Sequence, residues 1–331
     1  YKLVKTMRAG VLVLGPLLAK YKKAKVSLPG GCAIGTRPVD LHLLAFKKLG
    51  AKIKIKNGYI FASASNGLRG AKFEFPSISV GATENAILAA VQAKGITEID
   101  NCAIEPEIKD LICFLRKLGV YIKVEGRKIT IRGSLIQKRI SHKIICDRIE
   151  LGTYLIGGAL TAKKIKLKNI DPTLIKKEIS ILKKMGVKMK VNQNYIEVYK
   201  SKNIKSTNVT TSPYPGFPTD LQAQIMILMT QAKGLSKIKE SIFENRFMHV
   251  PELKRMGAKI EIRNNIAYVN GPCFLTGAEV MATDLRASVS LVLAALIADK
   301  RTKINRIYHL DRGYQDLEKK LIKCKAQISR V

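Results

Sequence analysis

The segment around Cys32 combines a flexible loop with a thiol and two side chains that can carry positive charge. A Pro-Gly-Gly sequence directly precedes Cys32, and Arg37 and His42 follow it. Glycines give such a loop little side-chain cover and much conformational freedom. A thiol close to cationic groups ionises readily and can serve as a proton donor or a nucleophile. The same residues also fit a surface loop that carries an incidental cysteine.

Arginines form a second group of candidate residues. Lysine fills the amphipathic surfaces, whereas several arginines lie at the openings of predicted helices and at turns: Arg8, Arg37, Arg148, Arg246, Arg286 and Arg312. A guanidinium binds phosphate or carboxylate in a bidentate geometry that an ammonium cannot copy. Arginines from different parts of the chain could therefore converge on a small polyanion. The alternative is local pairing, of Arg246 with Glu244 and of Arg312 with Asp311.

Two helix openings carry further candidates. Asp220 lies at the start of a predicted helix, where a carboxylate is ordinarily a cap and less often a general base. The sequence Ser79-Val80-Gly81 opens another helix, whose first backbone N–H groups could bind a diphosphate.

An eight-residue pattern ties these candidates to a repeated fold. It recurs at 46–53, 115–122, 182–189 and 253–260, with a worn copy at 321–328. In each full copy a helix ends in basic residues, a glycine supplies a left-handed cap, and an alternating strand follows. A short turn and a second strand come next. The period is longer than the 20 to 50 residues usual in solenoids, which leaves a solenoid as the weaker alternative.

Between these copies lie four predicted helices with few charges. They cover 86–93, 154–162, 221–232 and 287–298, and each follows an opening rich in Ser, Asp or Thr. A helix that is apolar nearly all round must be buried. The sequence therefore predicts an α/β protein built from repeats of about 68 residues, with the helices inside and the sheets outside.

Composition excludes several classes of protein and leaves the charge open to two interpretations. Of 331 residues, 47% are hydrophobic and 25% are charged, which excludes a disordered, collagen-like or disulfide-scaffold chain. The net charge of +34 suggests a nucleic-acid or other polyanionic partner. However, lysines alternate with apolar residues at 51–56 and 163–168, as they do on half-exposed strands. A solvated lysine-rich surface is the simpler interpretation, and nucleic acid is not the expected partner.

Segments for export, membrane insertion and metal binding are not apparent in the sequence. The longest apolar stretches fall short of the roughly 18 residues that a membrane span needs, and no signal segment opens the chain. Six scattered cysteines and four histidines give no zinc spacing. A reducing, cytoplasmic compartment fits this cysteine usage.

Seven ordered motifs together resemble one family of enzymes. They lie at 29–42, 79–84, 105–107, 217–224, 243–252, 282–286 and 308–314. In residue type and order they are similar to the UDP-N-acetylglucosamine 1-carboxyvinyltransferases, a family of enolpyruvyl transferases. The resemblance covers the whole chain.

The resemblance implies a fold and a reaction. The fold would be a two-domain inside-out α/β barrel with an active site in the cleft. The first domain would be 1–145, N-terminally incomplete with about two of three repeats, and the second would be 146–331 with three. The enolpyruvyl group of phosphoenolpyruvate would pass to the 3′-hydroxyl of UDP-N-acetylglucosamine, with release of phosphate and without a metal or other cofactor. This reaction opens peptidoglycan precursor synthesis, which links it to cell shape and cell division.

The resemblance also implies roles for individual residues. Cys32 would protonate the methylene of phosphoenolpyruvate and be the thiol that fosfomycin alkylates, and Asp220 would take the proton of the sugar hydroxyl. Arg37 and Arg312 would hold phosphoenolpyruvate, with Arg246 and Arg286 nearby. The residues that would bind the UDP-sugar are Arg8, Arg37, Pro38, Val39, Asp40, Leu41, Ser77, Ser79, Val80, Gly81 and Ile242.

Two departures from the family keep alternatives open. Five repeat endings stand where six are expected, and the missing repeat would carry a Lys-Asn pair that contacts phosphoenolpyruvate. Ser77 stands where many relatives have lysine. The alternatives are a 3-phosphoshikimate enolpyruvyl transferase, a catalytically impaired fragment, and a basic nucleic-acid-binding protein.

Overall fold

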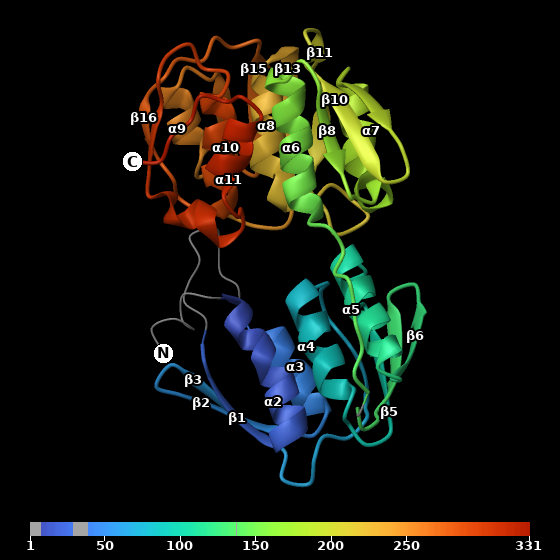
Figure 1. The fold of residues 1–331 in the computed structure, drawn as a ribbon. Coiled ribbons are helices and arrows are strands. Elements are labelled where there is room, and N and C mark those ends of the chain that lie inside the picture. Colours follow the sequence, from blue (N-terminus) through green and yellow to red (C-terminus); the bar gives the residue numbers. More distant parts are fainter. Residues whose placement is uncertain (1–7, 29–38, 137) are drawn as a thin grey trace. The chain divides into compact units, whose positions relative to one another are not determined.

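The structure of the chain, a computed structural model, describes residues 8–28, 39–136 and 138–331 (Figure 1). Within the described residues the chain divides into two compact units, which follow one another at Ile145 and Cys146. Each unit has its own hydrophobic core. No helix in the described ranges is long and apolar enough to cross a membrane.

Unit 1 carries two sheets around its helices. The helices are η1 (Arg8–Val13), α2 (Leu14–Tyr21), α3 (Asp40–Lys48), α4 (Val80–Ala90) and α5 (Pro106–Lys117). The antiparallel sheet β1-β3-β2 consists of Lys23–Ser27, Tyr59–Ser63 and Lys52–Lys56. The mixed sheet β4-β5-β7-β6 consists of Lys72–Glu74, Ile96–Asp100, Lys128–Arg132 and Tyr121–Glu125.

Unit 2 has more elements of the same kinds. Its helices are α6 (Arg148–Thr161), η2 (Pro172–Ile175), α7 (Lys176–Lys184), η3 (Thr219–Leu221), α8 (Gln222–Thr230), α9 (Val250–Arg255), α10 (Leu285–Ala295), η4 (Ile307–Arg312) and α11 (Leu317–Lys323). The sheet β8-β10-β9 consists of Ile165–Lys168, Tyr195–Tyr199 and Lys188–Val191. The sheet β11-β13-β15-β14 consists of Ile204–Lys205, Ala232–Lys239, Ile266–Gly271 and Ile260–Arg263, with β12 (Asn208–Thr210) also paired to β13. A further pair joins β16 (Glu279–Met281) and β17 (Lys303–Asn305).

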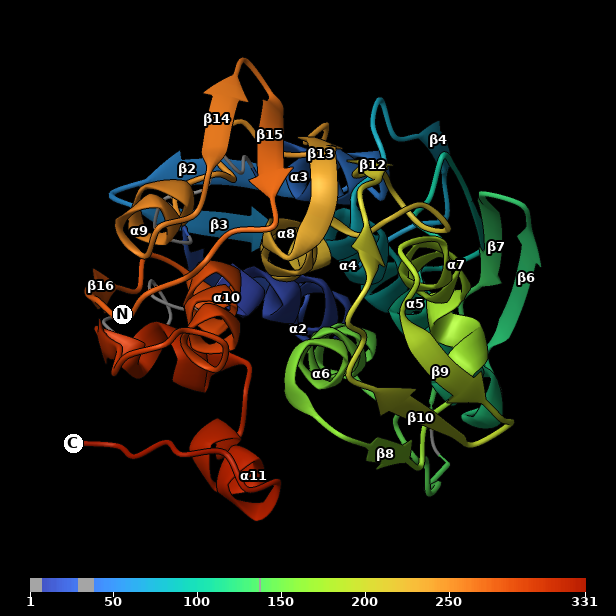
Figure 2. The ribbon, with the colours of Figure 1, turned by 90° about the horizontal axis from the view of Figure 1, so that it is seen from above.

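The helices predicted to be buried are buried. In α8 every residue is buried, and α8 contacts β13 and β15 of the sheet that lies over it (Figure 2). Most residues of α4, α6 and α10 are buried too. In α6, a Cβ on Gly158 would lie only 2.5 Å from Val198 Cγ1 and 2.6 Å from Ile165 Cγ2. Glycine at this position lets α6 approach β8 and β10 closely.

The repeated helix–glycine–strand units are also confirmed. Gly119 follows α5 with φ +93°, and β6 and β7 then form the predicted hairpin. Equivalent left-handed glycines follow α3, α7 and α9. In the worn copy after α11, Lys325 takes the glycine's place and still adopts φ +68°. The fold is therefore a mixed α/β fold assembled from a recurring local unit.

Candidate active site

Asp220 is held by two arginines from distant parts of unit 2. Arg246, in the loop before α9, donates from Nη2 to Asp220 Oδ1 at 2.6 Å. Arg286, in the first turn of α10, donates from Nη2 to Asp220 Oδ2 at 3.2 Å. The structure thus brings together three of the predicted site residues. The Asp220 side chain pairs with cations and is not a helix cap. Arg246 forms this long-range pair in place of the alternative local pair with Glu244.

Exposure differs sharply among these three residues. The side chains of Arg246 and Arg286 are 4% and 13% exposed, whereas that of Asp220 is 37% exposed. Asp220 is therefore the accessible member of the group, and both guanidiniums hold its carboxylate in place.

Arg286 also donates a hydrogen bond to a buried tyrosine. Its Nη1 donates to Tyr314 Oη at 3.2 Å, and Tyr314 is itself 1% exposed. Burial alone would lower the pKa of the Arg286 guanidinium, but the Asp220 charge and Tyr314 raise it. Arg286 therefore stays positively charged at any physiological pH. Burial raises the pKa of Tyr314, while Arg286 acts to lower it.

Tyr314 belongs to a small buried network that also reaches Asp220. Its hydroxyl lies 2.9 Å from Thr153 Oγ1 on α6. Gln224 Nε2 on α8 lies 3.2 Å from the same Thr153 oxygen and donates to the Asp220 carbonyl at 2.9 Å. The buried helices α6, α8 and α10 therefore determine the positions of the Asp220 carboxylate and of Arg286. Sequence reasoning did not identify Tyr314, Gln224 or Thr153 as site residues.

Glu240 forms hydrogen bonds both to the residue before Asp220 and to the loop that follows β13. It is 2% exposed, and its Oε2 accepts from the hydroxyl of Thr219, the neighbour of Asp220, at 2.9 Å. Its Oε1 accepts from Ile242 N at 2.8 Å and from Phe243 N at 3.2 Å. Glu240 thus places Ile242, a predicted UDP-sugar contact, beside the start of η3. Nothing in the sequence indicates this role, because Glu240 directly follows a lysine-rich strand whose pattern suggests exposure.

A cap and a neutral histidine complete this part of unit 2. Asp284 accepts from Arg286 N at 2.8 Å and from Ala287 N at 3.1 Å, as the predicted cap of α10. The pKa of the buried His249 is lowered to about 4, chiefly by burial, with Asp284 acting to raise it and Arg246 to lower it. His249 is therefore neutral at pH 7 and adds no charge next to Arg246.

Arg312 is a predicted site residue that the structure does not pair with Asp220 within the described residues. It is exposed at the end of η4. The alternative local pair with Asp311 does not form in the described residues either, and Asp311 pairs with Arg330. Burial lowers the pKa of His309, and the charge of Arg312 lowers it further.

The predicted sites of unit 1 gather at the N-terminal ends of two neighbouring helices. Ser79 caps α4, accepting from Ala82 N at 3.3 Å, and Val80 and Gly81 form the first turn. Asp40 and Leu41 open α3, and His42 of α3 lies against Gly81. Val39 precedes α3, and exposed Ser77 precedes the cap of α4. Cys32, Arg37 and Pro38 lie outside the described residues, as does the side chain of Arg8 at the start of η1.

Glu84, on α4, has an unusual proton affinity. Burial raises its pKa to about 7, and the nearby carboxylates of Glu107 and Glu105 contribute to the increase. In the described ranges, no three His, Cys, Asp or Glu side chains are placed to hold a metal ion. We interpret Glu84 as a half-buried carboxyl group that is partly protonated near neutral pH.

Glu84→Gln is expected to stabilise the protein at pH 8 but not below about pH 4.5. Between about 4.5 and about 7 the folded state holds a proton that the unfolded state releases, so wild-type stability falls as the pH rises. The gain at pH 8 is at most about 3 kcal/mol. Thermal and urea unfolding at several pH values would measure it.

Glu98→Gln provides a matched control for that experiment. A hydrogen bond and a charge interaction with Lys128 lower the pKa of Glu98 in the folded protein. The stabilisation that Glu98 provides is therefore present above the pKa that Glu98 has in the unfolded chain. We expect Glu98→Gln to lose stability at neutral pH, the opposite sign. Equal behaviour of the two variants would contradict the assignment of Glu84.

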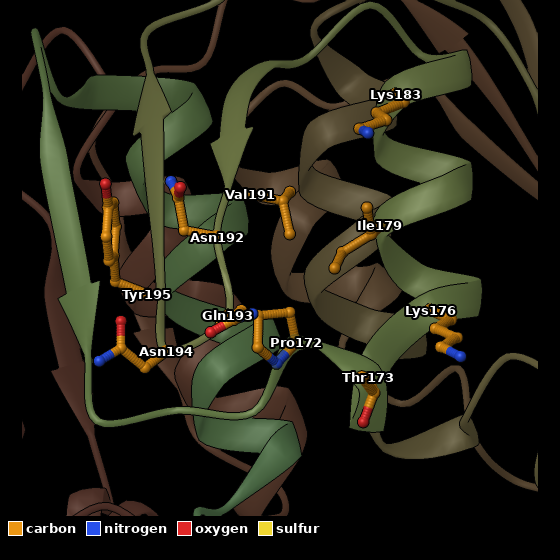
Figure 3. Close-up of a pocket in the computed structure, with 10 residues that line it drawn as sticks. All are labelled: Pro172, Thr173, Lys176, Ile179, Lys183, Val191, Asn192, Gln193, Asn194 and Tyr195. Carbon is orange, nitrogen blue, oxygen red and sulfur yellow. The ribbon is translucent and has the colours of Figure 1, made fainter.

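A hollow of about 830 Å³ lies elsewhere in unit 2, between η2, α7 and the β9–β10 turn (Figure 3). Its lining combines Lys176 and Lys183 with amides, Tyr195 and a few apolar side chains. None of the predicted site residues lines it, and its lining offers no acid–base pair. The hollow is therefore not a candidate active site, and Asp220 and its arginines remain the candidate.

Comparison with known proteins identifies the class of the fold and site. Residues 1–321 match the family described as EPSP synthase (3-phosphoshikimate 1-carboxyvinyltransferase). The enolpyruvyl transferase NikO from Streptomyces tendae has a similar structure, with a TM-score of 0.89 and 25% identity over 100% of this chain and 79% of that one. EPSP synthase from Acinetobacter baumannii shares the fold at a TM-score of 0.73 and 19% identity, over 98% and 79% of the two chains. The fold is that of the enolpyruvyl transferases.

Sequence relatives narrow the class further. A UDP-N-acetylglucosamine 1-carboxyvinyltransferase of Pelagibacter ubique (strain HTCC1062) is 60% identical over 100% of this chain and 80% of that protein. The protein of the same name from Rickettsia akari (strain Hartford) is 54% identical over 100% of this chain and 79% of its own length. The chain belongs to the UDP-N-acetylglucosamine 1-carboxyvinyltransferase family, as its motifs predict.

Proposed function

We propose that this protein transfers the enolpyruvyl group of phosphoenolpyruvate to the 3′-hydroxyl of UDP-N-acetylglucosamine and releases phosphate. Relatives that are 60% and 54% identical carry the name of this reaction. The observation that carries the proposal in the structure is the carboxylate of Asp220, accessible and held by Arg246 and Arg286. The reaction needs a base at an alcohol and cations at a phosphorylated acid, and this group combines both.

The proposed chemistry divides between an acid and a base. Asp220 takes the proton of the sugar 3′-hydroxyl while the 3′-oxygen of the sugar forms a bond to C2 of the enolpyruvyl group. Cys32 gives a proton to the methylene carbon, which makes C2 electrophilic. Loss of a proton from the new methyl group and of phosphate from C2 then restores the double bond. Arg37 and Arg312 hold the phosphoenolpyruvate, and nearby arginines stabilise the departing phosphate.

The UDP-sugar is assigned to the helix starts of unit 1. The first N–H groups of α4, at Ser79, Val80 and Gly81, offer donors and a positive helix end to the diphosphate. The remaining proposed contacts are Arg8, Arg37, Pro38, Val39, Asp40, Leu41, Ser77 and Ile242. The adjacency of α3 and α4, with His42 against Gly81, supports this grouping.

The wider context of the reaction belongs to the same proposal. The two compact units would be two domains, 1–145 and 146–331, each an inside-out α/β barrel. The reaction would supply peptidoglycan precursors in the cytoplasm, with consequences for cell shape and division, and fosfomycin would inactivate it at Cys32. The chain would need small-molecule substrates, and neither a metal, another cofactor nor nucleic acid.

Phosphate release from phosphoenolpyruvate, measured with and without UDP-N-acetylglucosamine, tests the proposal. We expect release only when the UDP-sugar is present. Release with shikimate 3-phosphate instead would favour the activity for which the matched family is named. Tight binding of duplex DNA with a steep salt dependence, without phosphate release, would favour a nucleic-acid-binding protein.

Tyr314→Phe is expected to lower kcat about tenfold while the protein stays folded. The variant removes the hydroxyl that holds Arg286 Nη1, and a hydrogen bond to a charged group is worth about 1.5 to 3 kcal/mol. Steady-state assays and thermal melts would measure both quantities. Tyr308→Phe, at a side chain that is 59% exposed, should leave kcat unchanged. Equal activity of the two variants would show that Tyr314 does not position Arg286.

A further inference from the structure

Asn85 connects four segments of unit 1 through one buried side chain. It lies on α4 and is completely buried. Its Oδ1 accepts from Gly15 N at the start of α2, at 2.9 Å. Its Nδ2 donates to the Val11 carbonyl of η1 at 2.9 Å and lies 3.0 Å from His42 Nδ1 on α3. All three of these contacts join residues far apart in the sequence.

These contacts determine which nitrogen of His42 carries the proton. The backbone N–H of Gly15 can only donate and the carbonyl of Val11 can only accept, so the Asn85 amide has a single orientation. Its second Nδ2 hydrogen therefore faces His42 Nδ1, which must accept it and carries no proton. His42 is then a neutral imidazole with its proton on Nε2.

The protonated side of His42 borders the proposed UDP-sugar site. A Cβ on Gly81 would lie 3.3 Å from His42 Cε1 and 3.5 Å from His42 Nε2. The Cε1–Nε2 edge of the ring therefore lies along the first turn of α4. Backbone N–H groups in the first turn of a helix have no acceptor within the helix and favour an anion. A protonated Nε2 adds to that positive edge, whereas the other tautomer would turn a lone pair toward the anion.

We propose that Asn85 is a positioning residue of the nucleotide-sugar site: it holds His42 as the Nε2–H tautomer and fixes η1, α2 and α3 against α4. The ligand class is a nucleoside diphosphate sugar, and this inference rests on the proposed function. Asn85 acts through His42 and through the helix starts that carry Arg8, Asp40 and Gly81. It has no part in the proton transfers assigned to Asp220 and Cys32.

The first test is nitrogen NMR of the full chain labelled at its four histidines. His42→Gln assigns the His42 signals. We expect Nδ1 of wild-type His42 to be unprotonated and Nε2 to be protonated near pH 7.5, and the Nε2–H signal to shift when UDP-N-acetylglucosamine is added. Protonation of Nδ1, or a His42 spectrum unchanged at a saturating UDP-sugar concentration, overturns the inference.

Asn85→Asp tests the link to binding. A carboxylate cannot donate to His42 Nδ1, so it draws a proton onto that nitrogen and changes the spectrum. We expect KM for UDP-N-acetylglucosamine to rise about tenfold or more, with a much smaller change in kcat, because one well-placed hydrogen bond is worth about a factor of ten. A rise in KM without any change in the His42 spectrum would contradict action through His42.

Thr83→Val is the matched control. Thr83 is also fully buried on α4, and its hydroxyl accepts a hydrogen bond from Ala103 N at 3.0 Å. It should lose stability but keep the His42 tautomer and the KM. If Asn85→Asp and Thr83→Val change KM equally, Asn85 is only structural. Absence of UDP-sugar-dependent phosphate release would refute the proposed function, while the wild-type tautomer would still be measured independently.

Discussion

Asp220→Asn is expected to reduce UDP-sugar-dependent phosphate release by about 10² to 10⁴-fold, the range that loss of a general base produces. The amide has nearly the shape of the carboxylate but cannot take the proton of the sugar hydroxyl. It also removes the negative charge that lies between Arg246 and Arg286. Both effects act on turnover, so we expect kcat to fall far more than either KM rises.

The same variant must be shown to be folded. Removing one partner of a fully buried ion pair costs about 3 to 5 kcal/mol, but the Asp220 side chain is more than a third exposed, so the loss here is smaller. Asp311→Asn removes an exposed carboxylate that pairs with Arg330 and serves as a matched control. Asp220→Asn with more than a tenth of wild-type kcat would exclude Asp220 as the base.

Local features of the sequence were sufficient to predict the repeated architecture. A basic helix end, a glycine and an alternating strand are specified by neighbouring residues, and the structure reproduces them down to φ +93° at Gly119. Apolar composition on all sides predicts burial in the same local way, as α8 shows. These predictions succeeded because the backbone and the hydrophobic effect act over a few residues.

Contacts between distant polar residues were beyond the reach of sequence reasoning from neighbours alone. Arg246 bonds to Asp220, 26 positions away, and not to Glu244. Asn85 reads as an ordinary helix residue until Gly15, Val11 and His42 come to lie around it. A buried polar group must find its partners wherever the fold brings them. The resemblance to a family located Asp220, whereas only the structure revealed what holds it in place.

The residues that support the site follow the same logic. Glu240 and Tyr314 each satisfy several buried donors or acceptors around Asp220. Tyr314 ends the motif at 308–314, but the sequence assigned neither residue a role in the site. A chain with a net charge of +34 has few carboxylates available to balance its arginines. Where one of these carboxylates is nearly buried, as Glu240 is, several groups depend on it. Burial and the number of partners therefore identify supporting residues that residue type does not.

Cys32→Asp is expected to keep measurable turnover and to escape fosfomycin, whereas Cys32→Ala should lose about 10² to 10⁴-fold in kcat. A carboxylic acid can still give a proton to the methylene carbon of phosphoenolpyruvate, but a methyl group cannot. Alkylation by the epoxide needs a thiolate nucleophile, and a carboxylate is a much weaker one. Phosphate release before and after incubation with fosfomycin would measure both properties.

Because the protein has other thiols, the test must also identify which cysteine is alkylated. Cys113 and Cys324 are exposed in the described part of the chain, so labelling of the protein alone would not identify Cys32. Peptide mass spectrometry should find the adduct on Cys32 in the wild type, and Cys113→Ser should be inactivated at the wild-type rate. If Cys32→Asp were inactivated as fast as the wild type, the thiol that fosfomycin attacks would be a different one. Cys32 would then lose its proposed place as the proton donor, because that role and the alkylation are assigned to it by the same motif.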